Sequence, residues 1–332
     1  MKWGLIGAST IASEHVIGAI RAQGGEIPSV LSSDPARGAD YAARHGIGRA
    51  TDDLSNLLGE AGLDAVYIST TNEKHHSQAL AAIAAGKHVL CEKPLAMTLD
   101  EAAEMARAAD AAGLVFATNH HLRNAGSHLA IRDLVAAGRI GRVLSARVFH
   151  AVHLPPHLQG WRINDAGAGG GVIPDITVHD ADTIRFYLGE DPVEVVALAG
   201  ASGMGAGVED SVMSVWTMPS GAMVQSHESF THPFAGSGVE LHGTEGSIFG
   251  RGIMTQKPLG ELDLVDAAGR HAVAFDRHDL YARSVALFVE AVAGRGRPAA
   301  DGVDGVKSLA VALAVREAAR TRRAVRVDYA GF

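Results

Sequence analysis

The sequence predicts a two-part α/β protein, with a doubly wound parallel sheet followed by an α+β part whose open sheet is mostly antiparallel. Three observations predict it. In the first third of the chain, short apolar runs alternate with alanine-rich segments. A glycine-containing turn follows the first apolar run, as in nucleotide-binding folds. Later runs alternate polar and apolar residues, which is typical of strands with one covered face.

The first part should contain five strands and four helices in alternation. The expected strands are KWGLIGA (2–8), IPSVLSS (27–33), DAVYIST (64–70), KHVLCEKP (87–94) and LVFATNH (114–120). The helical segments between them are 10–23, 35–46, 76–86 and 98–113. Nearly continuous apolar strands separated by helices indicate a parallel sheet covered on both faces.

The pattern changes after residue 123. A helix over 127–138 precedes a strand at 143–152, and four further segments alternate with period two: 194–200, 210–218, 222–230 and 238–243. We therefore expect a Rossmann domain over residues 1–122 and a substrate-binding α+β domain over 123–332. No Pro-, Gly- or Ser-rich linker separates them, so we expect a shared packed interface, where ligands tend to bind.

Composition narrows the function classes. The chain has 332 residues, 47% hydrophobic and 20% charged, with a formal net charge of -8. Nucleic-acid or anionic-membrane binding requires clustered positive charge, so we expect neither partner. The single cysteine, Cys91, lies in an apolar run and is interpreted as a small buried hydrophobe. With no signal peptide or long apolar segment, we expect a cytoplasmic protein.

The turn GLIGASTIA (4–12) resembles a degraded dinucleotide fingerprint. Gly7 supplies the first glycine and Ala12 an acceptable third position, whereas Ser9 replaces the middle glycine. A strand–turn–helix junction points backbone N–H groups at the pyrophosphate. We expect Gly7, Ser9, Thr10 and Ile11 to bind the cofactor, with the Ser9 hydroxyl partly replacing the close approach that glycine allows.

The end of the second strand favours NADP. NAD-binding chains place an acidic residue about twenty positions after the fingerprint, and Ser32 occupies that place here. Ser32, Ser33 and Arg37 suit a 2′-phosphate, because hydroxyls and a planar guanidinium bind its oxygens. Asp34 leaves NAD open, since a small shift would aim it at the ribose.

Three longer motifs carry a resemblance to a known family. The run STTNEKHHSQALAAIAAGKHVLCEKPLAMT, the stretch WRINDAGAGGGVIPDITVHDAD (161–182) and VELHGTEGS (239–247) are similar to the glucose–fructose oxidoreductase and inositol dehydrogenase family. The turn with its serine, TTNE, TNHHLRNA and VFHAVHLPPHLQGWR resemble a bacterial reductase branch. That resemblance implies NADPH-dependent reduction of a ketone on a sugar-like ring.

The EKP motif gives the fourth strand of the first part its expected role. Parallel strands end at the cofactor crevice, so Lys93 is expected beside the nicotinamide with Glu92 to neutralise and position it. Lys93 would stabilise the negative charge that develops on the substrate oxygen. The resemblance makes a cis Lys93–Pro94 bond plausible.

His179 is the candidate proton donor, because an imidazole titrates near neutrality. Asp175 lies four residues earlier, so a helix through both would point them to the same side, where Asp175 binds a substrate hydroxyl or the imidazole. Whether Lys93 or His179 delivers the proton stays open. Asp182 is interpreted as a helix or interface residue and Asp180 as solvated.

The resemblance implies further pocket residues. Lys93, Asp175 and His179 would bind substrate. Glu92 and Lys93 would also line the cofactor site, with other positions that match the family's cofactor or pocket residues: Thr71, Asn72, His75, Asn119, Trp161, Arg162 and Tyr281.

Two other functions are open to this sequence. Because the chain has seventeen histidines, one alternative is a metal-dependent sugar isomerase. The spacings of these histidines place no three imidazoles on one face, so we expect no metal. A non-catalytic nucleotide sensor is the other, although it need not keep Lys93, Asp175 and His179. The polar strand 222–230 is a poor centre for an obligate interface, which weakly favours a monomer.

Overall fold

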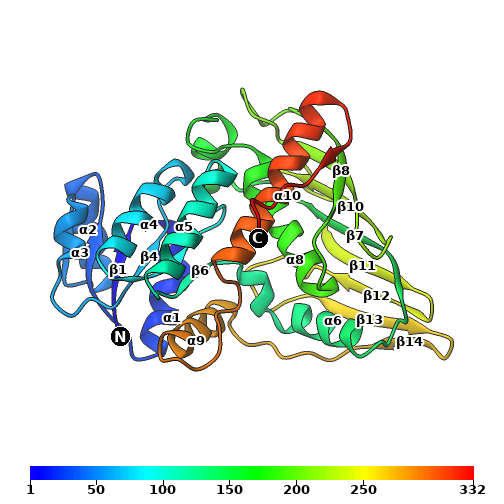
Figure 1. Cartoon of the computed structure of the whole chain (residues 1–332), viewed down its shortest axis with the longest axis horizontal. Helices are drawn as coiled ribbons and strands as arrows, with labels where there is room; N and C mark the ends of the chain where they lie inside the picture. Colours follow the sequence, from blue (N-terminus) through cyan, green and yellow to red (C-terminus); the bar gives the residue numbers. More distant parts are fainter. The chain divides into compact units, whose positions relative to one another are not determined.

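The computed structural model describes all residues 1–332 and divides the chain into two compact units (Figure 1). The first unit comprises Met1–His120 and Tyr281–Val306, and the second comprises His121–Leu280 and Lys307–Phe332. Residues 281–306 thus belong with the N-terminal part, although they follow the second sheet in sequence.

The first unit is built on a six-stranded, entirely parallel sheet in the order β3-β2-β1-β4-β5-β6. The strands are β1 (Lys2–Ile6), β2 (Glu26–Leu31), β3 (Arg49–Thr51), β4 (Ala65–Ile68), β5 (His88–Cys91) and β6 (Phe116–Thr118). The chain moves outward from β1 to β3 and then returns to β4 on the other side of β1. This reversal creates the switch point at which the carboxyl ends of strands receive ligands.

This unit also contains helices, of which those over 54–58 and 280–292 were not predicted, and the second of these follows the strands of the other sheet in sequence. The helices are the π-helix η1 (Ala12–Val16) with α1 (Ile17–Ala22), α2 (Pro35–His45), α3 (Leu54–Leu58), the 3₁₀ turn η2 (Asn72–Lys74) with α4 (His75–Ala84), α5 (Leu99–Ala111), and α9 (Leu280–Val292). Local signals begin two of them. The Asp34 carboxylate accepts from the first amides of α2, and Thr98 with Glu101 forms a capping box at α5.

The second unit contains a nine-stranded sheet in the order β14-β13-β12-β11-β7-β10-β9-β8-β15. Its strands are β7 (Val143–Ala151), β8 (Glu194–Gly200), β9 (Ser211–Thr217), β10 (Met223–Ser229), β11 (Ser237–Gly243), β12 (Gly246–Arg251), β13 (Glu261–Asp266), β14 (Gly269–Ala272) and β15 (Val325–Arg326). All pairs are antiparallel except β7 with β10. The expected mostly antiparallel open sheet is confirmed.

Helices cover one face of this sheet (Figure 1). They are η3 (His121–Asn124), α6 (Gly126–Ala136), α7 (Pro156–Gln159), η4 (Gly160–Ile163), η5 (Ile173–Thr177), α8 (Val178–Leu188), and the part of α10 (Gly302–Thr321) from Lys307 onward. Alternate residues of each strand pack against them. Val224 of β10 and Trp216 of β9 are fully buried there, as are Val311 and Val315 of α10.

The other face of the large sheet is open. Gln225 of β10 is exposed, as the polar pattern of that strand predicts, but neighbouring strands place apolar side chains on the same face. The exposed apolar residues of β8 to β10 on this face are Val196, Leu198, Met213, Val215 and Met223. One strand alone therefore understates how apolar this face is, and the monomer stays a prediction.

Candidate active site

The turn after β1 has a backbone that requires glycine. Gly7 has φ of +113°, and a Cβ there would lie 3.0 Å from the Ser69 backbone. Its N–H donates to Leu31 O at 3.1 Å, so the turn is held against the end of β2. This tight approach leaves the amides of the following η1 helix at the carboxyl edge of the sheet, as a pyrophosphate site needs.

Ser9 is anchored inside the protein. Its hydroxyl lies 2.7 Å from Ser69 Oγ and accepts from Ala12 N–H at 3.2 Å, while its carbonyl accepts from Tyr41 Oη at 2.9 Å. The hydroxyl therefore caps the first helical turn, whose N-terminal residues include Thr10 and Ile11. Ser9 stabilises the shape of the turn in addition to any contact that it makes with a phosphate.

The end of β2 shows how the expected NADP-selecting residues are used. Asp34 Oδ1 accepts from Ala36 N at 2.9 Å and from Arg37 N at 3.1 Å. The Arg37 guanidinium donates to Ala8 O at 2.5 Å, which brings it beside the glycine turn. Ser32 Oγ donates to Asp34 O at 2.9 Å, and Ser33 is exposed. Arg37 and the two serines thus lie near the turn, whereas the Asp34 carboxylate caps α2.

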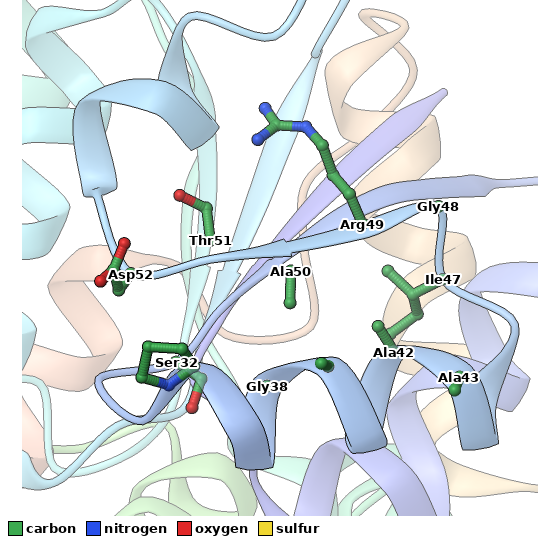
Figure 2. Close-up of a pocket in the computed structure, with 12 residues that line it drawn as sticks. Ser32, Gly38, Ala42, Ala43, Ile47, Gly48, Arg49, Ala50, Thr51 and Asp52 are labelled. Atoms are coloured by element: carbon green, nitrogen blue, oxygen red, sulfur yellow. The ribbon is translucent and has the colours of Figure 1, made fainter.

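A groove of about 430 Å³ lies between α2 and β3. Figure 2 shows Ser32 and Asp52 at one end of it and Ile47 and Gly48 at the other. Of the expected cofactor residues only Ser32 lines it. The groove therefore extends from the edge of the expected adenosine site along the outermost strand, away from the EKP motif.

The Glu92 carboxylate is held by neutral donors. Its Oε1 accepts from Tyr67 Oη and from Asn119 Nδ2, each at 2.6 Å, and Asn119 Oδ1 in turn accepts from Ser284 Oγ at 3.3 Å. Burial, and then the Glu92 charge, raise the pKa of Tyr67 well above its ordinary value, so Tyr67 remains a donor. This arrangement fixes Glu92 directly before Lys93 at the end of β5, and the Lys93–Pro94 bond is cis.

His75, which is completely buried, ties the EKP motif to the loop after β4. Its Nδ1 lies 2.9 Å from Pro94 O and its Nε2 3.2 Å from Thr70 O. Burial lowers the pKa of His75 in spite of these carbonyls. Thr71 is the N-cap residue of the η2 turn, and Asn72, which is 4% exposed, is the first residue inside the turn. The expected pocket residues of this loop are therefore brought to the carboxyl edge.

Tyr281 belongs to the same unit despite its distance in sequence. It is 1% exposed, and its ring stacks on His15 of η1 with centroids 4.4 Å apart.

Cys91, at the end of β5, is buried, and burial raises its thiol pKa well above the usual value. A thiol held protonated in this way is a packing residue, as the sequence predicts.

The second unit brings Trp161, Arg162 and Asp175 together. The Arg162 guanidinium lies over the Trp161 ring at 4.6 Å from its centroid, and Arg162 Nε is 3.5 Å from Asp175 Oδ1. Gly170 allows this turn, because a Cβ there would lie 2.6 Å from Trp161 O. Gly170 is thus required by the chain's own backbone. Arg162 faces the Asp175 carboxylate, which the sequence did not reveal.

Asp175 and His179 lie on one continuous helical stretch, as expected. Asp175 is in the π-helix η5, and His179 is in α8, which follows without a break. Two further imidazoles surround His179, which is 7% exposed: its ring centroid lies 4.9 Å from that of His121 and 6.4 Å from that of His150. We call His121, His150 and His179 the histidine cluster.

The expectation that Asp180 is solvated is wrong. Its side chain is completely buried between α8 and the sheet, and Oδ1 lies 3.3 Å from His150 Nδ1. Glu228 of β10, which sequence reasoning assigned only to a polar strand, is also completely buried and lies opposite His150 in strand register. Burial raises the pKa of both carboxyls well above their ordinary values. A signal was present in the sequence, since Ser226 and Glu228 lie two and four positions after Val224 and therefore on the same face of β10 as that apolar residue.

Asp182 lies two positions further along α8 and has a different environment. It is 1% exposed and forms a two-pronged ion pair with Arg123, with both N–O distances at 2.8 Å. Ser308 Oγ adds a hydrogen bond at 3.2 Å. Asp182 therefore fixes α8 to η3, the segment that carries His121.

The structure contains no group of three His, Cys, Asp or Glu side chains arranged to hold a metal ion. No helix is long and apolar enough to cross a membrane. The donor sets described above are of the kind that binds a dinucleotide and an oxygen-rich small molecule.

Family models match both parts of the chain. The model described as an oxidoreductase family with an NAD-binding Rossmann fold matches residues 1–120, and the GFO/IDH/MocA C-terminal domain matches residues 128–249.

Known proteins are similar along the whole length. The 1,5-anhydro-D-fructose reductase of Ensifer adhaerens is 57% identical over 328 residues, covering 98% of each chain. A D-xylose 1-dehydrogenase (NADP(+)) of Haloferax volcanii is 30% identical, covering 99% of this chain and all of that one. The solved structure of levoglucosan dehydrogenase with NADH and L-sorbose has a TM-score of 0.90 at 24% identity over the full length of both chains, and it shows the same fold.

Proposed function

Because the chain belongs to the GFO/IDH/MocA oxidoreductase family, we propose that it catalyses the NADPH-dependent reduction of 1,5-anhydro-D-fructose to 1,5-anhydro-D-mannitol. The observation that carries this proposal is the 57% identity, over 98% of both chains, with a 1,5-anhydro-D-fructose reductase. The site residues that the EKP and Asp175–His179 motifs contribute are those that a carbonyl reduction requires. We place the enzyme in the cytoplasm, where NADPH is available.

NADPH as the cofactor is supported by the residues at the end of β2. The Asp34 carboxylate already accepts hydrogen bonds from the amides of α2, which leaves it poorly suited to accept another from a ribose hydroxyl. Arg37 lies beside the glycine turn, near Ser32 and Ser33. A 2′-phosphate carries close to two negative charges and is bound well by a guanidinium with hydroxyl donors.

The reaction needs a hydride, which NADPH supplies when bound, and one proton for the substrate oxygen. Lys93 stabilises the negative charge that develops on that oxygen, and Glu92, held by Tyr67 and Asn119, positions Lys93. His179 donates the proton. Asp175, oriented by Arg162, accepts a hydrogen bond from a ring hydroxyl.

A second candidate is another NAD(P)-dependent sugar or polyol dehydrogenase of the family, which the 30% identity to a D-xylose 1-dehydrogenase favours. The deciding experiment follows the near-ultraviolet absorbance of NADPH with 1,5-anhydro-D-fructose, other ketoses and dicarbonyl sugars, and of NADP⁺ with aldoses and polyols. We expect the highest kcat/KM with 1,5-anhydro-D-fructose, and chromatography should identify the mannitol epimer. Oxidation of an aldose with higher kcat/KM would favour the second candidate, and activity with neither set would indicate a nucleotide sensor.

A further inference from the structure

Asp180 and Glu228 form a pair of carboxyl groups inside the second unit. Both side chains are completely buried, and both lie beside His150: Asp180 Oδ1 is 3.3 Å from its Nδ1, and Glu228 lies opposite it in strand register. Neither Asp180 Oδ2 nor Glu228 Oε2 receives a hydrogen bond from an N–H or O–H donor. Two ionised carboxylates buried beside each other repel, which favours a proton on one of them.

The position of Glu228 follows from strand register. β10 pairs with β7 so that Glu228 lies opposite His150, and both side chains point to the face covered by α8. The Ser226 hydroxyl, on the same face of β10, donates to Glu228 Oε1. Asp180 comes from α8, and its Oδ1 lies 3.3 Å from His150 Nδ1. Three elements distant in sequence therefore meet at His150.

Few charged groups face this pair. His150 is the ion-pair partner of Asp180, and no lysine or arginine pairs with either carboxyl. Tyr187 of α8 lies near Asp180, but its pKa is raised well above the ordinary value, chiefly by burial. His128 hydrogen-bonds Tyr187 at 2.7 Å, and burial lowers the pKa of His128 to about 4, so it is neutral. One negative charge on the pair would therefore act mainly on the histidine cluster.

The histidine cluster needs such a charge. With three imidazoles this close, a proton on one ring disfavours a proton on its neighbours. Burial also disfavours the charged form of an imidazole. Asp180 directly follows His179 in α8, and His150 lies between the carboxyl pair and the His179 ring.

We propose that Asp180 and Glu228 together hold one proton and one negative charge, and that this buried charge, acting through His150, keeps a proton on the histidine cluster from which His179 acts. Asp180, Glu228 and His150 are thus positioning residues for the proton donor. The inference rests on the proposed function only in its assignment of His179 as that donor. Its consequence is that His179 stays charged at a pH where three crowded imidazoles would otherwise lose their proton.

The first test detects the shared proton. Infrared spectra of the whole protein at neutral pH should show the carbonyl stretch of a protonated carboxylic acid. Glu228→Gln should remove that band, because the amide mimics the protonated acid and leaves the charge on Asp180. Glu240→Gln, on the opposite face of the same sheet, is the matched control and should retain the band. Absence of the band from the wild-type protein would overturn the proposal.

The second test measures the effect on His179. An NMR titration of the imidazoles, assigned with His179→Asn, should show the His179 pKa lowered by about one pH unit in the double variant Asp180→Asn/Glu228→Gln, which has lost the charge. Glu228→Gln alone should leave the His179 pKa near that of the wild type, because the charge remains. An unchanged His179 pKa in the double variant would overturn the proposal.

A stability measurement keeps the proposal testable if the double variant does not fold. The pKa of Glu228 is raised in the folded state. At a pH above the ordinary pKa of a glutamate, the folded protein therefore keeps on Glu228 a proton that the unfolded chain has lost. The contribution of Glu228 to the free energy of unfolding is therefore present at low pH and declines as the pH rises. Relative to Glu228→Gln, the wild-type unfolding constant should grow by about tenfold per pH unit above about pH 4.5. Equal pH slopes for the two proteins would contradict a shared proton.

These measurements need no substrate, which separates this inference from the proposed function. If the protein fails to reduce 1,5-anhydro-D-fructose but the band and the His179 shift are found, the proposed function fails and the charge pair stands. If the protein is an active reductase and His179 titrates alike in all variants, the inference alone fails. In an active enzyme, the pH profile of hydride transfer should move with the His179 pKa.

Discussion

The two units handle buried charge in opposite ways. In the first, the Glu92 carboxylate is held by neutral donors, Tyr67 and Asn119, from the neighbouring strand β4 and from the end of β6. In the second, Asp180 and Glu228 face each other from α8 and β10 and must share a proton. The first arrangement holds a charge in a fixed place. The second holds a charge whose amount depends on pH.

The difference follows from how each sheet gathers residues. In a parallel sheet the carboxyl ends of all strands meet at one edge, so short motifs after each strand come together whatever the exact register. In the mixed sheet of the second unit, Glu228 meets His150 because β10 and β7 pair in one register, and Asp180 meets them because α8 packs on that face. A one-residue slip would place Glu228 on the open face.

The largest expected effect is on His179, where the second unit acts on the reaction. His179→Asn keeps the size of the side chain but cannot donate a catalytic proton at neutral pH. We expect hydride transfer in stopped-flow experiments to fall by about 10²- to 10⁴-fold, with NADPH affinity preserved. His271→Asn, on the exposed strand β14, is the control and should leave the rate unchanged. Hydride transfer near the wild-type rate in His179→Asn would reduce this residue to a packing role.

The next largest effect concerns stability in the second unit. Asp182→Asn leaves the buried Arg123 guanidinium without its counter-charge, so the free energy of unfolding should fall by about 3–5 kcal/mol. Urea denaturation measures this. Asp133→Asn breaks the exposed pair with Arg132 and should cost less than about 1 kcal/mol. Equal losses in both variants would mean that α8 does not depend on its buried ion pair.

A smaller effect tests the first unit, where Arg37 is expected to bind the 2′-phosphate. Arg37→Ala should weaken NADPH binding by about 10- to 150-fold, corresponding to about 1.5–3 kcal/mol for a charge-assisted hydrogen bond, and should change NADH binding little. Fluorescence titration of both cofactors gives the comparison. Arg44→Ala, on the same helix but paired with Asp40 at the surface, is the control. Equal losses for NADPH and NADH would remove the basis for choosing NADPH.

The smallest expected effect is on assembly. We expect the protein to be monomeric in light scattering at micromolar concentration. Leu198→Glu and Met213→Glu, which place charge on the exposed apolar residues of β8 and β9, should then leave the mass and the activity unchanged. A dimer or tetramer that these substitutions dissociate would show that the open face of the sheet is an interface.

Much of the first unit could be predicted from the chain alone. Its strands, its helices and the motifs of the cofactor site are local patterns: an apolar run, a glycine turn, a cap, a charged pair before proline. Several elements were not predicted, either because they are short or because no periodicity was assigned to their segment. β3 has three residues, α3 has five, and β12 to β15, α9 and α10 lie in segments whose periodicity we did not assign. Residues 281–306 belong with the first unit because of packing, which no local pattern reports.

The sequence by itself determined the fold class, the cofactor turn with Gly7, the EKP motif and the placement of Asp175 and His179 on one helical stretch. Only the tertiary structure decided which polar residues are buried. Asp180 and Glu228 read as surface residues because an isolated charge is costly to bury. Burial becomes tolerable when each carboxyl finds the other, a shared proton and His150, and those partners lie about 30 to 80 residues apart along the chain. Strand register and helix packing bring them together, and neither is written in a local stretch of sequence.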